Sequence, residues 1–302
     1  MSDEKSNWLA TASDYGKEFA KLPPAFFNRI AWMLLPKQMK KSCLDETMTR
    51  VAQQYIEKTM PDHIQQIAAS MSDKNPALVA RAVLTAMDQN ISKQENRENI
   101  AKNAIIELND IIESRQLPEN EPSKEFKDTF FRYAENISTE EAQKLWGKLL
   151  AGEIRNPGSF CPKTMEILSN ISIEHAEYFR ILCHCAPKNS CAVFINFNSE
   201  NTMIPTYYKA SILESYGLIK TGCSISYNKD YIFTYGEYAI SVSSSEKHVQ
   251  VDTFTPFGDE LRKLITLDNE LITKLFPEII QNLTVKQNLT VKIIIGPNVA
   301  TS

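Results

Sequence analysis

Cys183, His184 and Cys185 form a compact group of side chains that can ligate a metal ion, and Cys191 follows shortly after them. Thiolate sulfur and imidazole nitrogen are the ligands that zinc prefers. Structural zinc sites, however, pair their cysteines as C-x-x-C, whereas residues i and i+2 of a helix point apart. The spacing therefore favours buried thiols at a helix end, and we expect no metal and no cofactor.

The other reactive side chains form no catalytic signature. The four histidines lie far apart and outside any H-E-x-x-H string: His63, His175, His184 and His248. The nine glycines form no phosphate-binding loop. Glu140 and Glu141 are a carboxylate pair, but a capping box explains them, in which the Ser138 side chain accepts from the Glu141 amide. We predict no catalytic residue, and the sequence favours a non-enzymatic protein.

Composition indicates a globular protein of about two domains. The chain has 302 residues, of which 43% are hydrophobic and 23% charged, and this is enough to bury a sizeable core. The net charge of −4 provides no general attraction for nucleic acid. Six cysteines, and an N-terminus that does not resemble a secretion signal, predict a reducing, cytoplasmic location.

The first half of the chain has helical periodicity. Residues 1–43 are expected to form an N-terminal segment with one amphipathic helix, and residues 44–186 a helical domain. Within that domain the pattern predicts separate helices at Ala77 to Asp88 and at Glu95 to Ser114, followed by the polar connector Arg115 to Lys124. A later helix that contains Trp146 is expected to end at the Asn-Pro-Gly turn of residues 156–158.

The amphipathic segment Leu22 to Lys41 has two open interpretations. Its candidate contact residues are Phe26, Phe27, Ile30 and Trp32. Apolar residues on one face followed by lysines suit a helix at a membrane interface, although the segment is too short to cross a bilayer. The alternative, which the prolines at both ends favour, is a buried or partner-binding helix.

The second half changes to a mixed pattern. Residues 187–266 are expected to form a winged-helix-like α+β domain: a helix at Tyr207 to Tyr216 ending at Gly217, strand patterns at 231–243 and 249–254, and a helix opened by Thr255. Residues 267–302 are expected to form a C-terminal helix and a strand-like tail. This tail contains two consecutive copies of QNLTVK, at 281–286 and 287–292. The predicted fold is thus mainly α, a helical array followed by a smaller α+β end.

From about Asn96 to Leu264 the sequence resembles an uncharacterised bacterial family, a domain of unknown function. The matching strings are QKLWGKLLAGE at 143–153, NPGSF at 156–160, Thr164 to Leu168, and Leu213 to Ile219. Cys161 departs from the family, which usually has serine there. The layout is also similar to that of the abortive-infection alpha family. The resemblance implies a fold and a link to bacterial phage defence, but no reaction.

The shared strings allow two interpretations. Trp146, Glu153, Arg155 and Asn156 can form a surface for a partner at the end of the helix. Alternatively, Trp146 fills the core and the Asn-Pro-Gly turn only reverses the chain, which backbone requirements alone would explain.

A winged-helix-like end also suggests nucleic-acid binding as a function, with Lys209, Lys220 and Lys229 as the residues that would contact phosphates. Between Glu200 and Lys263, however, the sequence has six basic and eight acidic residues. A module that binds along a phosphate backbone needs a basic surface. We therefore expect an interaction or sensor protein with a protein partner, and keep a nucleic-acid-binding regulator as the alternative. Peripheral membrane contact is also open, and the sequence gives no oligomeric state.

Overall fold

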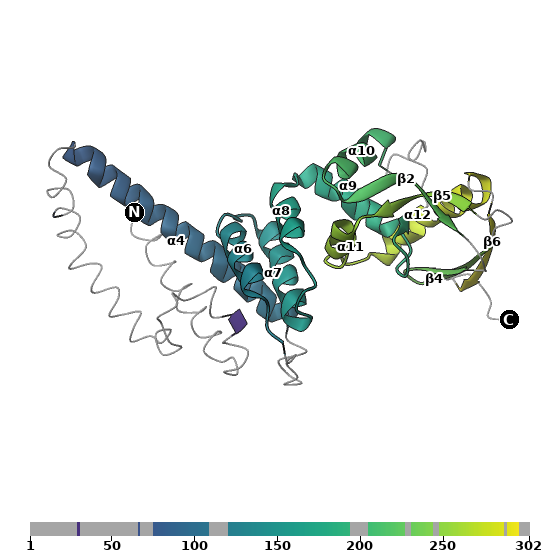
Figure 1. Cartoon of the computed structure of the whole chain (residues 1–302), viewed down its shortest axis with the longest axis horizontal. Helices are drawn as coiled ribbons and strands as arrows, with labels where there is room; N and C mark the ends of the chain where they lie inside the picture. Colours follow the sequence, from purple (N-terminus) through teal and green to yellow (C-terminus); the bar gives the residue numbers. More distant parts are fainter. Residues whose placement is uncertain are drawn as a thin grey trace. The chain divides into compact units, whose positions relative to one another are not determined.

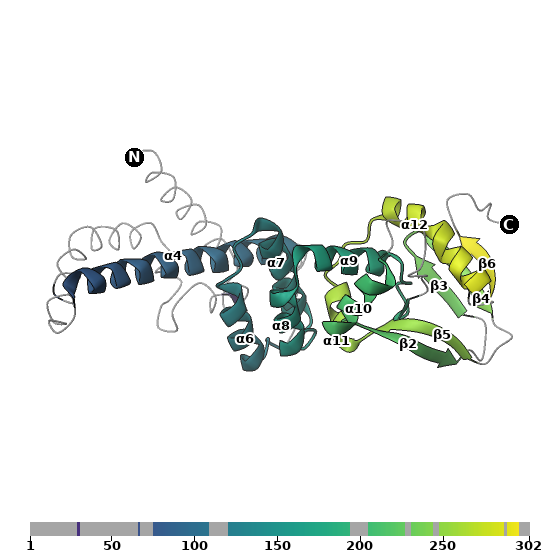
Figure 2. The same ribbon diagram turned by 90° about the horizontal axis from the view of Figure 1, so that it is seen from above.

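The structure, a computed structural model, describes residues 29–30, 66, 75–108, 120–193, 205–226, 231–243, 248–286 and 289–295. Its contacts divide the chain into two compact units, Met1–Pro162 and Lys163–Ser302. The predicted domain boundaries after residues 43, 186 and 266 stay predictions. Figures 1 and 2 label the helices and strands of both units.

The first unit contains the long helix α4 (Pro76–Glu107), α6 (Lys124–Ala134) and α7 (Glu140–Arg155). The prediction of two helices within α4 was wrong, because one helix of 32 residues runs through the polar stretch between them. That stretch has no glycine or proline to stop a helix. The helix begins where the Asn75 side chain accepts from the Ala77 amide, with Pro76 in the first turn.

α7 packs against α4 and carries more buried residues than either α4 or α6. Gly147 permits the close approach, since a Cβ at this position would lie 2.5 Å from the Asn103 Cβ. On the same helix Trp146 is buried against Phe130, with 5.2 Å between ring centroids. The predicted capping box is wrong: the N-cap is Thr139, without a side-chain hydrogen bond. Glu141 therefore occupies the second helical position, from which a capping box cannot form.

The second unit combines α8 (Pro162–Asn170), α9 (Ile173–His184), α10 (Tyr207–Ser215), α11 (Pro256–Arg262) and α12 (Asn269–Gln281) with two antiparallel sheets. The first sheet has the order β1-β5-β2, formed by Ala192–Val193, His248–Phe254 and Ile219–Ser226. The second has the order β3-β4-β6, formed by Tyr231–Tyr235, Tyr238–Ser243 and Thr290–Ile295. The mainly α fold with a smaller α+β end is confirmed (Figure 1).

The winged-helix interpretation stays a prediction. Gly217, whose φ is 76°, follows the C-cap of α10 as predicted, and the Thr255 side chain caps α11 by accepting from the Gly258 amide at 3.1 Å. β5 pairs with β2, whereas β3 and β4 form a separate hairpin turned by Gly236, with a φ of 55°. The strand patterns at 231–243 and 249–254 therefore belong to different sheets.

The tandem repeat adopts two structures. The first copy ends α12 and continues as a short π-helix, Asn282–Lys286. The second copy leads into β6, which lies at an edge of its three-stranded sheet. The Leu289 amide donates to the Leu283 carbonyl at 3.0 Å, so equivalent residues of the two copies are in contact.

Candidate functional site

The family-like strings of α7 form an internal packing unit. Glu153 is 1% exposed, and its carboxylate accepts from the Gly158 amide at 2.7 Å and from the Phe160 amide at 3.2 Å. Gly158 has a φ of 89°, which favours glycine. The buried carboxylate thus folds the NPGSF loop back onto the end of its own helix.

The predicted interaction surface on α7 stays a prediction, and two of its four residues are exposed. Trp146 and Glu153 are both buried, and neither is accessible to a partner. Arg155 and Asn156 are exposed, but the Arg155 guanidinium donates to the Glu107 carbonyl, and Asn156 caps the helix. Helical spacing puts Trp146 and Glu153 on the inward face of α7, a direction that the motif alone does not reveal.

Of the three cysteines predicted to be buried thiols, Cys183 and Cys185 at the end of α9 are buried, whereas Cys191 is exposed. Cys183 and Cys185 have no exposed surface, and burial raises the pKa of both thiols far above the usual range. A protonated thiol is a poor nucleophile and a poor metal ligand. Within the described ranges, no three metal-ligating side chains lie close enough together to hold an ion.

His184 connects the end of α9 to the start of α12. Its Nδ1 lies 2.7 Å from the Arg180 carbonyl oxygen, and its Nε2 lies 3.0 Å from the Asp268 amide nitrogen. The carbonyl requires a proton on Nδ1 and the amide requires a lone pair on Nε2, so the imidazole is neutral. Burial lowers the pKa of His184, against the opposing effect of the hydrogen bond to the Arg180 carbonyl.

Aromatic side chains gather on the outside of the second unit where α9 lies against α10. The His175 ring lies 5.8 Å from that of Tyr178 and 5.6 Å from that of Tyr216, and its Nδ1 is 3.1 Å from the Tyr216 hydroxyl. Three large side chains in the first turns of these two helices project into solvent: Ile173 of α9 is 86% exposed, and Tyr207 and Tyr208 of α10 are 60% and 73% exposed. We call this surface the tyrosine face and define it by Ile173, His175, Tyr178, Tyr207, Tyr208 and Tyr216.

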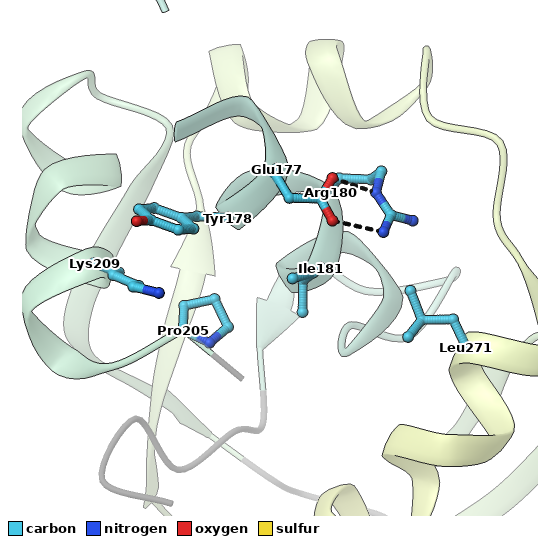
Figure 3. Close-up of a pocket in the computed structure, with 7 residues that line it drawn as sticks. All are labelled: Glu177, Tyr178, Arg180, Ile181, Pro205, Lys209 and Leu271. Carbon is cyan, nitrogen blue, oxygen red and sulfur yellow. Dashed lines mark hydrogen bonds and ion pairs between the residues drawn. The ribbon is translucent and has the colours of Figure 1, made fainter. Parts of the chain in front are cut away.

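A cavity of about 240 Å³ opens beside the tyrosine face (Figure 3). Ile181 of α9, Pro205 ahead of α10 and Leu271 of α12 supply apolar walls. Tyr178, Lys209, Glu177 and Arg180 complete the lining. Apolar walls with a few charged groups around them are typical of a binding site.

The two cations of the cavity differ in their contacts. Arg180 is held by Glu177 through two hydrogen bonds of 2.7 Å. The Lys209 ammonium instead lies 4.3 Å from the centre of the Tyr178 ring, and Figure 3 shows it directed toward Pro205. Nowhere in the described part of the chain does a carboxylate form an ion pair with Lys209. This arrangement offers binding groups but no nucleophile with an adjacent base.

Sequence reasoning missed the tyrosine face. Thr206 caps α10, and Tyr207, Tyr208 and Lys209 follow it directly. Successive residues of a helix point about 100° apart, and Ala210 and Leu213 already form the buried side. The two adjacent tyrosines that precede these buried positions in the sequence were therefore the signal from which an exposed aromatic surface could have been predicted.

The remaining predicted contact residues are scattered. Lys220 is exposed on β2, whereas Lys229 lies outside the described residues. Ile30 is 1% exposed, while Phe26, Phe27 and Trp32 also lie outside the described ranges. Among the helices that are described, none combines the length and the apolar character needed to cross a membrane.

The comparisons with known proteins identify a family but no activity. A family model described as a protein of unknown function, DUF2806, matches residues 80–233. The match includes both the α7 packing unit and the tyrosine face. No curated protein and no solved structure matches the chain. Because the matched residues make up just over half of its length, the chain belongs to the DUF2806 family of proteins of unknown function.

Proposed function

We propose that this protein is an interaction protein that binds a protein partner through the tyrosine face. The observation that carries the proposal is the exposure of Ile173, Tyr207 and Tyr208 on α9 and α10, the two helices that also contribute residues to an apolar cavity. Tyrosine is enriched at protein interfaces, because it supplies a large contact area with few rotatable bonds and a polar hydroxyl. A covered tyrosine buries about 150–250 Å², so a partner at this face would gain substantial contact area.

Nucleic-acid binding is the second candidate, and it draws its support from α10 and Lys220. α10 precedes a sheet strand and exposes two tyrosines on which bases can stack. Against it, Lys209 is the single base of α10, and its ammonium already contacts the Tyr178 ring. A salt titration with labelled oligonucleotides separates the two candidates, because binding through phosphates weakens steeply with ionic strength. No binding at about 50 mM salt would remove the second candidate.

The predicted sensor role, phage-defence context and cytoplasmic location rest on the resemblance and the composition, and they remain part of this proposal. Peripheral membrane contact is also kept as a proposal for the N-terminal segment. A plaque assay on cells with and without the gene tests the defence context.

The tyrosine face itself is tested by affinity capture from the lysate of the host cell. Full-length protein is compared with the double variant Tyr207→Ser and Tyr208→Ser, and captured proteins are quantified by mass spectrometry. Ile232→Ser is the matched control, because Ile232 is a 55% exposed apolar residue on β3, outside the face. We expect at least one protein to be retained by the wild type and the control, and about tenfold less by the double variant. Equal retention by all three proteins would overturn the proposal.

A further inference from the structure

We propose that the cavity beside the tyrosine face accepts an apolar side chain from an acidic peptide segment of the partner, with a neighbouring carboxylate paired to Lys209. This inference rests on the proposed function and adds the chemistry of the partner. Size, lining and charge each support it.

The volume of the cavity fits one side chain. A cavity of about 150 Å³ is large enough for benzene, and sites for drug-sized molecules begin at about 300 Å³. At about 240 Å³ this cavity lies between the two. A leucine or phenylalanine side chain therefore fits within it.

The lining selects an apolar group. Ile181, Pro205 and Leu271 present hydrocarbon to the cavity, and Pro205 is itself buried (Figure 3). Transfer of apolar area from water to such walls contributes about 25 cal/mol per Å². Glu177 and Arg180 neutralise each other through their paired hydrogen bonds. An apolar side chain that enters the cavity therefore does not have to desolvate an unpaired charge at either residue.

Lys209 supplies the charge preference. Its ammonium rests on the Tyr178 ring, 4.3 Å from the ring centre, and among the described residues it has no ion-pair partner. A carboxylate of the partner can reach this ammonium from solvent while an adjacent apolar residue enters the cavity. The ring limits the freedom of the lysine side chain, which lowers the entropic cost of pairing.

The number of cations at the cavity disfavours nucleic acid as the occupant. A phosphate backbone carries a charge at every nucleotide and is held by several cations. Here Arg180 is already paired with Glu177, which leaves Lys209 for a single carboxylate. Binding of an oligonucleotide is therefore treated as an opposing outcome of the experiment.

The test uses fluorescence anisotropy with defined probes. The main probe is the labelled octapeptide Ser-Asp-Asp-Leu-Phe-Asp-Asp-Ser. One control peptide replaces its aspartates with lysines, a second replaces Leu-Phe with Ser-Ser, and a labelled twelve-nucleotide deoxythymidine strand is the nucleic-acid probe. We expect saturable binding of the main probe by full-length protein and at least tenfold weaker binding of the other three. Equal binding of the acidic and basic peptides, or tighter binding of the oligonucleotide, would overturn the inference.

Two lysine variants locate the binding. Lys209→Glu should weaken binding of the acidic peptide at least tenfold, whereas Lys220→Glu, an equal change of charge on β2, should leave it within twofold. Circular dichroism checks that both variants are folded, and Lys209→Gln replaces Lys209→Glu if the latter is not. Equal loss in both variants would indicate attraction by overall charge and would overturn the inference.

Affinity capture separates this inference from the proposed function. If the tyrosine double variant loses a host protein that Lys209→Glu still retains at the wild-type level, the acidic-peptide inference fails and the proposed function stands. If neither variant loses that protein, both fail. Loss of the protein by both variants, together with the peptide results, supports both.

Discussion

The α7 packing unit and the tyrosine face both present aromatic and charged residues in a small space, yet they use them in opposite ways. In the packing unit Trp146 is 1% exposed, and the Glu153 carboxylate accepts from two backbone amides. In the tyrosine face Tyr208 is 73% exposed, and Lys209 contacts a ring rather than a carboxylate. The first region completes its contacts within the chain, whereas the second leaves surface for another molecule.

The difference shows that the most recognisable string of a sequence need not be its functional site. In the LWGKLLAGE and NPGSF strings a buried tryptophan, a close glycine contact and a left-handed turn each tolerate few residue types. A binding surface is constrained only by what binds it. In this chain the strings on which the resemblance was based contribute to the packing of the first unit, and the proposed site carries no motif.

The largest expected effect comes from truncating the tryptophan. Trp146→Ala should lower the free energy of unfolding by about 3–5 kcal/mol, because it removes a buried side chain and leaves a cavity against Phe130. Tyr208→Ala should change it by less than about 0.5 kcal/mol, because that side chain is mostly in solvent. Urea unfolding followed by circular dichroism measures both.

A loss of about 2 kcal/mol or more in Tyr208→Ala would contradict the contrast between the two regions, since it would give the tyrosine face a role in folding. A loss below about 1 kcal/mol in Trp146→Ala would also contradict this contrast, since it would mean that the α7 packing unit contributes little to stability. The tyrosine variant should at the same time weaken capture of the partner, which Trp146→Ala affects only through unfolding.

A smaller effect is expected at the buried carboxylate. Glu153→Ala leaves the amides of Gly158 and Phe160 without their acceptor. The Phe160 amide is buried, and leaving it unpaired costs about 1–3 kcal/mol, whereas water can reach the exposed Gly158. We expect a loss of about 2–3 kcal/mol for Glu153→Ala and a smaller loss for Glu153→Gln, which keeps one acceptor oxygen. Glu141→Ala is the control on the exposed side of α7, with an expected change within about 0.5 kcal/mol. Equal losses for Glu153→Ala and its control would refute the role of this carboxylate.

Features specified by neighbouring residues were predicted from the sequence. Thr255 caps α11 by accepting from the Gly258 amide at 3.1 Å, and Gly217 takes its positive φ just after α10. The turn at Gly158 is a further example. Each of these is decided within about four residues, where hydrogen-bond geometry and backbone sterics dominate.

Features decided by distant contacts were not predicted. The two copies of QNLTVK have the same intrinsic preferences, yet one ends a helix and the other enters a strand, because the second copy is followed by isoleucines that pair with β4. The direction of Trp146 and Glu153 into the core depends on α4 and on the returning loop. The cavity likewise joins residues of α9, α10 and α12 that lie far apart in the chain.

α9 contains both a buried and an exposed region, because its first half carries residues of the tyrosine face and its last residues are buried. The neutral His184 imidazole accepts from the Asp268 amide, and a protonated imidazole cannot. Around the ring, Glu177 and Asp268 favour the protonated form, while burial and Arg180 disfavour it. Because burial dominates, the pKa of His184 in the folded chain lies below its ordinary value of 6.5.

A group whose pKa is lowered by folding binds more protons when the chain unfolds, so stability falls as the pH falls. The contribution of His184 is complete above about pH 6.5 and is lost as the pH drops through the lower pKa of the folded state. We expect the wild type to lose more stability between pH 7 and pH 5 than His184→Gln does, by about 1 kcal/mol, the net contribution of one hydrogen bond. Urea unfolding followed by circular dichroism at both pH values measures the difference. Identical losses of unfolding free energy in the two proteins would show that a neutral His184 imidazole does not stabilise the buried end of α9.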